Sequence, residues 1–164
     1  MIYAVIDTNV IVSALITKNA NSPVVEIMKK AFAGEFKLLI NESIFAEYRE
    51  VLGRPKFGLD QDRIDDALSY LSKIAISIEV PSSGVILPDL KDAVFYDVAL
   101  FHQDKKASLV TGNIKHFPNT VFAVTPREFL DKLKIEEELN KCLDLLDFPD
   151  SGLMLNDCRA AYCC

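Results

Sequence analysis

Two kinds of segment alternate along the chain. Short apolar runs rich in β-branched residues are bounded by polar residues, and longer segments between them carry apolar residues every three or four positions. The short runs are typical of strands buried on both faces, and their alternation with helices favours a parallel sheet covered on both sides. We therefore expect an α/β fold of three layers, α/β/α, around a central, mostly parallel sheet of four or five strands. The runs are residues 1–6, 36–40, 76–80, 108–110 and 121–124.

The helical segments carry their own start signals. Ser22-Pro23 and Thr125-Pro126 place a proline at a first helical position, Asn41 is a good N-cap, and Asp92 suits a helix start. Helices are predicted over about 24–33, 42–52, 60–75, 92–101 and 126–133. The apolar residues 10–16 fit either a buried helix or a second strand.

Composition narrows the class of protein. With 164 residues, half of them apolar, one domain is expected. No apolar stretch reaches the roughly 18 residues of a spanning helix, and the N-terminus lacks the basic region of a secretory signal, so no membrane association is expected. The net charge of −6 excludes a protein that binds nucleic acid through a wholly basic surface.

The last 30 residues differ from the rest. Residues 135–164 hold seven acidic residues against Lys141 and Arg159, whereas residues 1–134 are nearly neutral. We predict a main domain over 1–134 and an acidic extension over 135–164, in which an amphipathic helix packs on the domain or on a partner before a disordered end. Cysteines occur only in this extension, which favours a reducing, cytoplasmic setting. They are Cys142, Cys158, Cys163 and Cys164.

Carboxylates lie at or near the carboxyl ends of several predicted elements. Asp7 follows the first strand, and Asp92 starts the helix after the third. Glu47 lies about 100° from the centre of the apolar stripe of its helix, at the border of the buried face. Ligand crevices of parallel sheets lie at the carboxyl ends of their strands. Two alternatives stay open: Asp7 only caps the next helix, and Glu47 only forms a border salt bridge with Arg54.

Oxygen ligands that converge in one cleft favour a hard divalent cation. Carboxylates held close together repel one another, and Mg²⁺ or Mn²⁺ relieves that repulsion. Such a centre activates a water and stabilises the leaving oxygen of a phosphodiester. The sequence shows no histidine and cysteine cluster suited to zinc and no evident Ser-His-Asp arrangement.

Four motifs occur in this order along the chain: Val5–Val10, Glu47–Leu52, Asp92–Leu100 and Leu109–Phe117. Together they resemble those of the PIN domain, the small metal-dependent ribonuclease fold of many VapC-like toxins. The resemblance covers about residues 1–134 and implies a PIN-like fold. It implies that Asp7, Glu47 and Asp92 are the catalytic acids and metal ligands. It also implies that Asn9 and Thr111 organise the site through hydrogen bonds.

The fourth acidic position of the family falls on Asn113 in this sequence. We predict that Asn113, rather than Asp97, occupies it, because Asp97 lies about 140° around the helix from Asp92. Asp97 then either acts through a water or is a solvated charge. His116 contacts a phosphate or is a structural residue beside Phe117.

Positive side chains border the acids and are candidates for RNA binding. The resemblance implies a Mg²⁺- or Mn²⁺-dependent endoribonuclease, the toxin of a toxin–antitoxin pair, with an RNA substrate, an antitoxin partner and a homodimeric state. The alternatives are an RNA-processing nuclease without an antitoxin and a non-catalytic PIN-like binding module. The main candidates for RNA contacts are Arg49, Arg54, Lys91, Lys115 and His116, and the other bordering cations are Lys56, Lys105 and Lys106.

Overall fold

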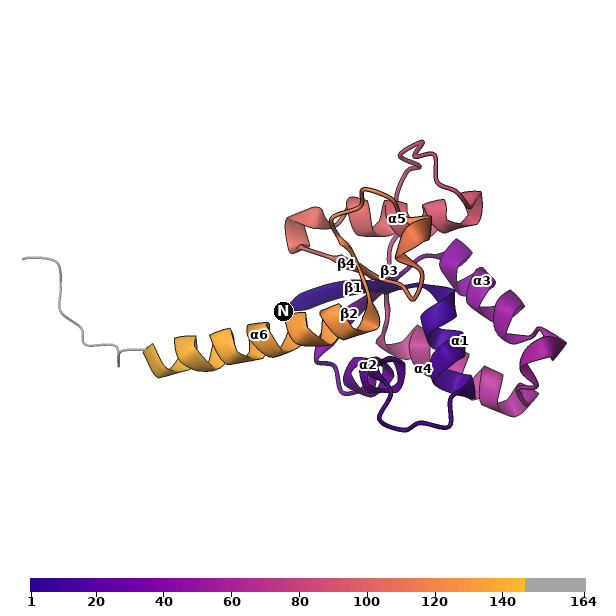
Figure 1. Cartoon of the computed structure of the whole chain (residues 1–164), viewed down its shortest axis with the longest axis horizontal. Helices are drawn as coiled ribbons and strands as arrows, with labels where there is room; N and C mark the ends of the chain where they lie inside the picture. The colour runs from indigo at the N-terminus through magenta and orange to yellow at the C-terminus, as the bar shows by residue number, and fades with distance from the viewer. Residues whose placement is uncertain (147–164) are drawn as a thin grey trace, which may run out of the picture.

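Five parallel strands form the centre of the protein (Figure 1). A computed structural model describes residues 1–146 of the chain, with side chains up to residue 143. Within these residues the strand order is β3-β2-β1-β4-β5, and every neighbouring pair is parallel. This confirms the predicted α/β class and the parallel sheet. The strands are β1 (Ile2–Ile6), β2 (Phe36–Ile40), β3 (Ile76–Ser77), β4 (Ser108–Val110) and β5 (Ala123–Val124).

The strand order places a crevice beside the end of β1. From β1 the chain proceeds outward through β2 to β3, then returns to the other side of β1 to form β4. Ile6 of β1 pairs with Val110 of β4, so these two strands end side by side. In parallel α/β sheets, the position at which the strand order reverses is where ligands bind. Asp7 and Thr111 are the next residues of the two strands, so both lie at this position.

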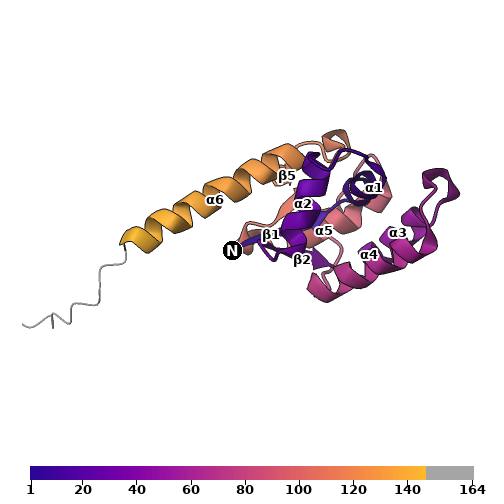
Figure 2. The same ribbon diagram turned by 90° about the horizontal axis from the view of Figure 1, so that it is seen from below.

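Helices cover both faces of the sheet. In Figure 1, α5 lies on one face, whereas α2 and α6 lie on the other. Figure 2 shows α3 and α4 running side by side at the edge of the molecule. In residues 1–146 no helix combines the length and the apolar character needed to cross a membrane. The helices are α1 (Thr8–Ile16), α2 (Pro23–Phe32), α3 (Glu42–Leu52), α4 (Gln61–Ile74), α5 (Ala93–Leu100) and α6 (Pro126–Leu146).

The helix starts follow the predicted capping chemistry, with differences at Ser22 and at Asp92, whose side chain also makes no capping bond. The Asn41 side chain accepts a hydrogen bond from the Ile44 backbone amide at 2.8 Å. Thr125 and Glu128 form a reciprocal capping box. The Thr125 backbone amide donates to the Glu128 carboxylate at 2.7 Å, and the Glu128 backbone amide donates to the Thr125 hydroxyl at 3.3 Å. Ser22 occupies the N-cap of α2, but its hydroxyl makes no capping bond. Residues 10–16 belong to helix α1 rather than to a second strand.

Two predicted strands are shorter than expected. The run 76–80 contributes only Ile76 and Ser77 to the sheet, and the run 121–124 contributes only Ala123 and Val124. Both strands lie at edges of the sheet, where each pairs with a single neighbouring strand and the hydrogen-bond ladder between them ends early. Val121 is 94% exposed, so apolar composition alone extended the second prediction too far.

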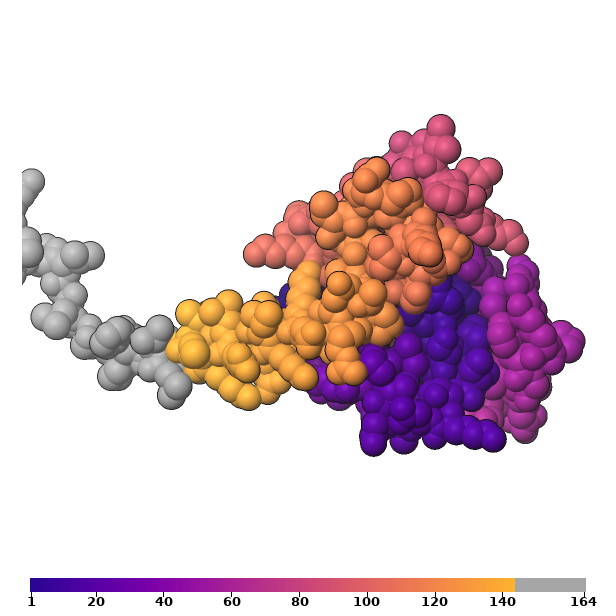
Figure 3. All heavy atoms as spheres, viewed as in Figure 1, coloured from indigo at the N-terminus to yellow at the C-terminus, as the bar shows by residue number. Residues whose placement is uncertain are grey.

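Helix α6 is continuous across residue 134, where we predicted a boundary. Phe129, Leu130 and Leu133 are buried in the first half of α6, and the second half stands clear of the body (Figure 3). Ile135, Leu139 and Leu143 are 66%, 54% and 55% exposed, so the predicted apolar face of this segment is not buried on the described part of the domain, although Glu136 pairs with the N-terminal amine. Packing on a partner stays a prediction. The expectations for residues 147–164, which include three of the four cysteines, lie outside the described residues.

Truncation after Lys134 is expected to leave a folded domain. The truncation removes exposed helix and an exposed ion pair between the N-terminal amine and Glu136, so the expected loss of unfolding free energy is under about 1 kcal/mol. Urea unfolding of residues 1–134 checks this, with Leu130→Ala in the full chain as the control that opens the core and costs about 2–5 kcal/mol. An insoluble or molten truncated protein would contradict the prediction.

Candidate active site

Asp7 is both a helix cap and a site carboxylate. It directly follows β1, is only 4% exposed, and its Oδ1 accepts the Asn9 backbone amide at 3.2 Å. Its Oδ2 accepts two further hydrogen bonds, from the Asn9 side-chain amide and the Thr111 hydroxyl, each at 2.6 Å. The capping interpretation is therefore correct, and it leaves Asp7 in the wall of a cavity with its orientation fixed by three donors.

Asn9 joins the ends of the two central strands. Its side-chain amide donates to Asp7 and, at 3.3 Å, to the Thr111 hydroxyl. Its side-chain oxygen accepts the Gly112 backbone amide at 2.9 Å. The Thr111 hydroxyl also accepts the Asn113 backbone amide at 3.0 Å. These bonds hold the chain after β4 against the chain after β1, as expected for residues that organise a site.

Glu47 reaches the same cavity from α3. Its carboxylate accepts a hydrogen bond from the Thr8 hydroxyl at 2.7 Å. Arg54 pairs instead with Glu50, at 2.8 Å, so the border salt bridge considered for Glu47 does not form. The neighbouring Tyr48 is fully buried, and its hydroxyl donates to the Ile6 carbonyl. Helix α3 is thereby fixed against the end of β1 at the turn that carries Glu47.

Asp92 lies where a short 3-10 turn, η2 (Leu90–Asp92), runs into α5. The residue is 8% exposed, and its carboxylate is 2.8 Å from Nδ1 of His116. His116 lies in another 3-10 turn, η4 (Ile114–His116), which follows β4. The ring of His116 therefore orients one of the acids, and its contact with a phosphate stays a prediction.

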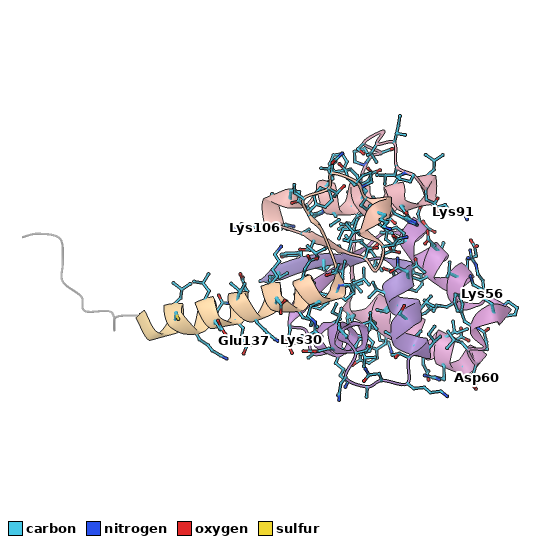
Figure 4. All side chains as sticks on the ribbon, viewed as in Figure 1. Lys30, Lys56, Asp60, Lys91, Lys106 and Glu137 are labelled. Atoms are coloured by element: carbon cyan, nitrogen blue, oxygen red, sulfur yellow. The ribbon has the colours of Figure 1, made fainter. Side chains whose placement is uncertain are left out.

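The three acids share one cavity of about 390 Å³. A second hollow of about 530 Å³ adjoins it, and Glu47, Val51, Arg54 and Asp92 belong to both. Lys91 lines the second hollow and Lys56 the first, and both labelled lysines lie beside α3 in Figure 4. Arg49 and Lys115 line neither of these two hollows, nor do Lys105 and Lys106.

The cavity holds more negative charge than its surroundings balance. Burial is the largest cause that raises the pKa of Asp7, of Glu47 and of Asp92. The charge of Asp7 raises the pKa of the other two further, and that of Asp92 reaches about 6 although His116 lowers it. Lys91 is close enough to lower the pKa of Glu47. Neighbouring carboxylates with raised pKa values favour a cation among them.

The donor set fits a hydrated hard cation. Among residues 1–146, no three acidic, histidine or cysteine side chains meet closely enough to enclose an ion by themselves. Mg²⁺ is usually held by one or two carboxylates and keeps several waters, so such an enclosure is not required. Asp7, Glu47 and Asp92 would hold such a hydrated ion with oxygen ligands alone.

The other predicted ligands lie outside the cavity. Asp97 is 6% exposed, so the interpretation as a solvated charge is wrong. Its carboxylate accepts the backbone amide and the hydroxyl of Ser83, which fixes the loop before α5. Asn113 is partly exposed next to Thr111, and its side chain does not line the acid cavity. Its place as the fourth ligand stays a prediction. Asp89 caps η2 by accepting the Lys91 amide at 3.0 Å.

Three residues of the site were missed from the sequence. They are Thr8, which binds Glu47, Gly112, which binds Asn9, and Phe57, which lines the acid cavity. Thr8 and Gly112 do lie inside the first and fourth motifs, and the lack of a side chain at Gly112 was an available signal for a close approach. Phe57 lies in a turn outside every motif.

The fold and the site together define an α/β protein with an acidic centre where the strand order reverses. Residues 3–115 match the family model of the PIN domain, and the chain belongs to this family. Among solved structures, the chain is similar to VapBC2 from Rickettsia felis bound to a DNA fragment from its promoter. The TM-score is 0.48 with 15% identity, over 76% of this chain and 97% of that chain. No curated protein matched the sequence.

The metal-free protein is expected to lose stability as the pH rises from about 4 to about 7. The pKa of Asp92 is near 6 in the folded state against an ordinary value of 3.8, so protonated Asp92 favours the folded state. This contribution is complete below the lower pKa and is lost above the higher one. Partial solvent screening reduces the expected loss to about 1–2 kcal/mol. Urea unfolding in EDTA at both pH values measures it.

Asp92→Asn is expected to remove that part of the pH dependence. Asp62→Asn, on an exposed turn of α4, is the matched control and should leave the pH dependence as in the unaltered chain. An Asp92→Asn protein with the same pH dependence as its parent would contradict the assignment of the shift to Asp92.

Proposed function

We propose that the protein is a Mg²⁺- or Mn²⁺-dependent endoribonuclease. The observation that carries the proposal is the shared cavity of Asp7, Glu47 and Asp92, in which burial and the charge of Asp7 raise the pKa of the other two acids. Membership of the PIN family adds the reaction class, because PIN domains are generally nucleases that use divalent metal ions. A divalent ion, when bound, lowers the pKa of a water and stabilises the leaving oxygen of a phosphodiester.

The protein's own residues position the acids and the substrate. Asn9 and Thr111 hold the Asp7 carboxylate in one orientation, and His116 does the same for Asp92. Thr8 restrains Glu47 at the border of α3. Lys91, at the edge of the adjoining hollow, supplies positive charge for a backbone phosphate. Pre-positioned charges of this kind act without reorganisation during the reaction.

We further propose that this nuclease is the toxin of a toxin–antitoxin pair, acting in the cytoplasm as a homodimer with a cognate antitoxin. The motif resemblance supports this finer assignment. An RNA-processing nuclease without an antitoxin is the alternative within the same fold, and co-expression separates the two. If expression of the protein arrests growth and co-expression of a small protein encoded next to its gene relieves the arrest, the toxin assignment is supported. If growth is not arrested, the RNA-processing nuclease is supported.

The experiment that tests the nuclease proposal is cleavage of total cellular RNA by the purified protein. With Mn²⁺ we expect discrete fragments whose ends map to a limited set of sites, and with EDTA we expect none. An Asp7→Asn/Asp92→Asn double variant purified in parallel controls for contaminating ribonucleases. Equal cleavage by the variant, or no cleavage with either metal, would favour the non-catalytic binding module.

A further inference from the structure

Part of the lining of the acid cavity comes from a turn that the acidic chemistry does not use. This turn, η1 (Pro55–Phe57), follows α3 and contributes Lys56 and Phe57 to the lining of the acid cavity. We propose that Phe57 is a stacking platform for one unpaired base, next to the phosphate at the acids. The inference rests on the proposed function, because it assigns the form of RNA that the same site accepts.

The turn is rigid enough to hold a ring in one place. Pro55 fixes the backbone at its start, and Gly58 ends it with φ of 59°, a left-handed conformation that glycine adopts readily. The Phe57 amide donates to the Arg54 carbonyl, and the Gly58 amide donates to the Pro55 carbonyl, both at 3.1 Å. The ring is therefore positioned by a closed turn.

The ring has one side against the core and another in the cavity. Phe57 is partly buried and packs against the hydrophobic core, yet it lines the same cavity as the three acids. The Lys56 ammonium lies 4.8 Å from the centre of the ring, as in a cation–π pair. Figure 4 shows Lys56 on the side of the molecule formed by α3. A flat apolar group and a cation are thus presented together beside the carboxylates.

This combination matches the chemistry of single-stranded nucleic acid. Proteins bind single strands by stacking bases on aromatic rings and by contacting the backbone with cations. A base that stacks on Phe57 displaces the Lys56 ammonium, which is then free to contact a neighbouring phosphate. A base within a duplex is stacked on both sides and cannot reach the ring. The site therefore selects unpaired RNA, with little preference among the four bases.

A binding measurement without metal tests the platform separately from cleavage. Fluorescence anisotropy in EDTA at low salt measures the Kd of a set of eight-nucleotide RNAs. Each RNA carries a single abasic nucleotide, at a different position in each member of the set. With the unaltered chain, one abasic position is expected to raise the Kd about ten-fold. Phe57→Leu keeps an apolar side chain but should make all positions equivalent, whereas Phe57→Trp should keep the position-specific effect.

Phe45→Leu is the matched control. Phe45 is also partly buried and carries a cation, with the Arg49 guanidinium 5.4 Å from its ring centre, but it lines neither the acid cavity nor the adjoining hollow. This variant should behave as the unaltered chain. Far-UV circular dichroism of all three variants checks that the fold is kept.

The outcomes distinguish this inference from the proposed function. A position-specific effect that Phe57→Leu removes and Phe45→Leu keeps supports the platform, even if the protein fails to cleave RNA with Mn²⁺. No position-specific effect in the unaltered chain, no detectable binding, or the same effect in Phe57→Leu overturns it, even if the protein cleaves RNA. Tight binding of a fully paired duplex would overturn the selection of unpaired RNA.

Discussion

The Asp7→Asn variant is expected to cleave RNA at least about a hundred-fold more slowly than the unaltered chain. The amide keeps the size of the side chain but removes the charge that holds a cation, and interactions of several kcal/mol with the transition state depend on that cation. Single-turnover cleavage of a defined RNA with Mn²⁺ measures the rate. A variant with more than about a tenth of the parental rate would contradict the role of Asp7.

The same variant is expected to be slightly more stable without metal. Burial raises the pKa of Asp7, so a neutral side chain relieves an unfavourable charge. The gain is limited to about 1 kcal/mol, because the new NH₂ group must face a donor where the carboxylate accepted three hydrogen bonds. Asp97→Asn is the matched control. Asp97 is another buried aspartate with its own donors from Ser83, but it lies outside the cavity. Its variant should lose stability and keep the cleavage rate.

Gly112→Ala is expected to lower the cleavage rate about ten- to a hundred-fold while leaving the domain folded. A Cβ at this position would lie 3.0 Å from the side-chain oxygen of Asn9, so Asn9 must move. Its hydrogen bonds to Asp7 and Thr111 would then be disturbed, and small displacements of catalytic groups cost large factors in rate. The effect therefore reaches the acid through Asn9.

A double-mutant cycle shows whether Asn9 is the route. If Gly112→Ala acts by displacing Asn9, it should have little further effect in an Asn9→Ala background. Gly53→Ala is the control, because its Cβ would also make a tight contact, 3.3 Å from the Arg49 carbonyl, outside the cavity. Additive effects of Asn9→Ala and Gly112→Ala would show that Gly112 acts by another route.

Much of the fold followed from the sequence because its signals are local. The apolar run ending at Ile6 and the cap at Asn41 act within a few residues, and both predictions are confirmed. The motif resemblance implied that Thr111 supports the site, and the structure provides this contact because β4 pairs with β1, so that Thr111 bonds Asp7. The edge strand at Ile76 was overextended because an apolar run does not reveal how many neighbours a strand has.

The remaining parts of the site depend on contacts between distant segments. A helical wheel placed Glu47 at a border but gave no sign that Thr8 would bind it. The same method gave no partner for Asp97, since its partner Ser83 lies in a loop whose path no periodicity describes. Phe57 carried no signal for the site in the sequence, because the cavity that it lines forms only when residues from distant segments come together.

The most direct test of the metal centre is X-ray diffraction near the manganese absorption edge, from crystals grown with Mn²⁺ at neutral pH. The account predicts one strong anomalous peak in the acid cavity, among the carboxylates of Asp7, Glu47 and Asp92. In crystals of Asp7→Asn the peak should be weak or absent. A strong peak elsewhere and none between these acids, with Mn²⁺ present and RNA cleavage intact, would contradict the central claim.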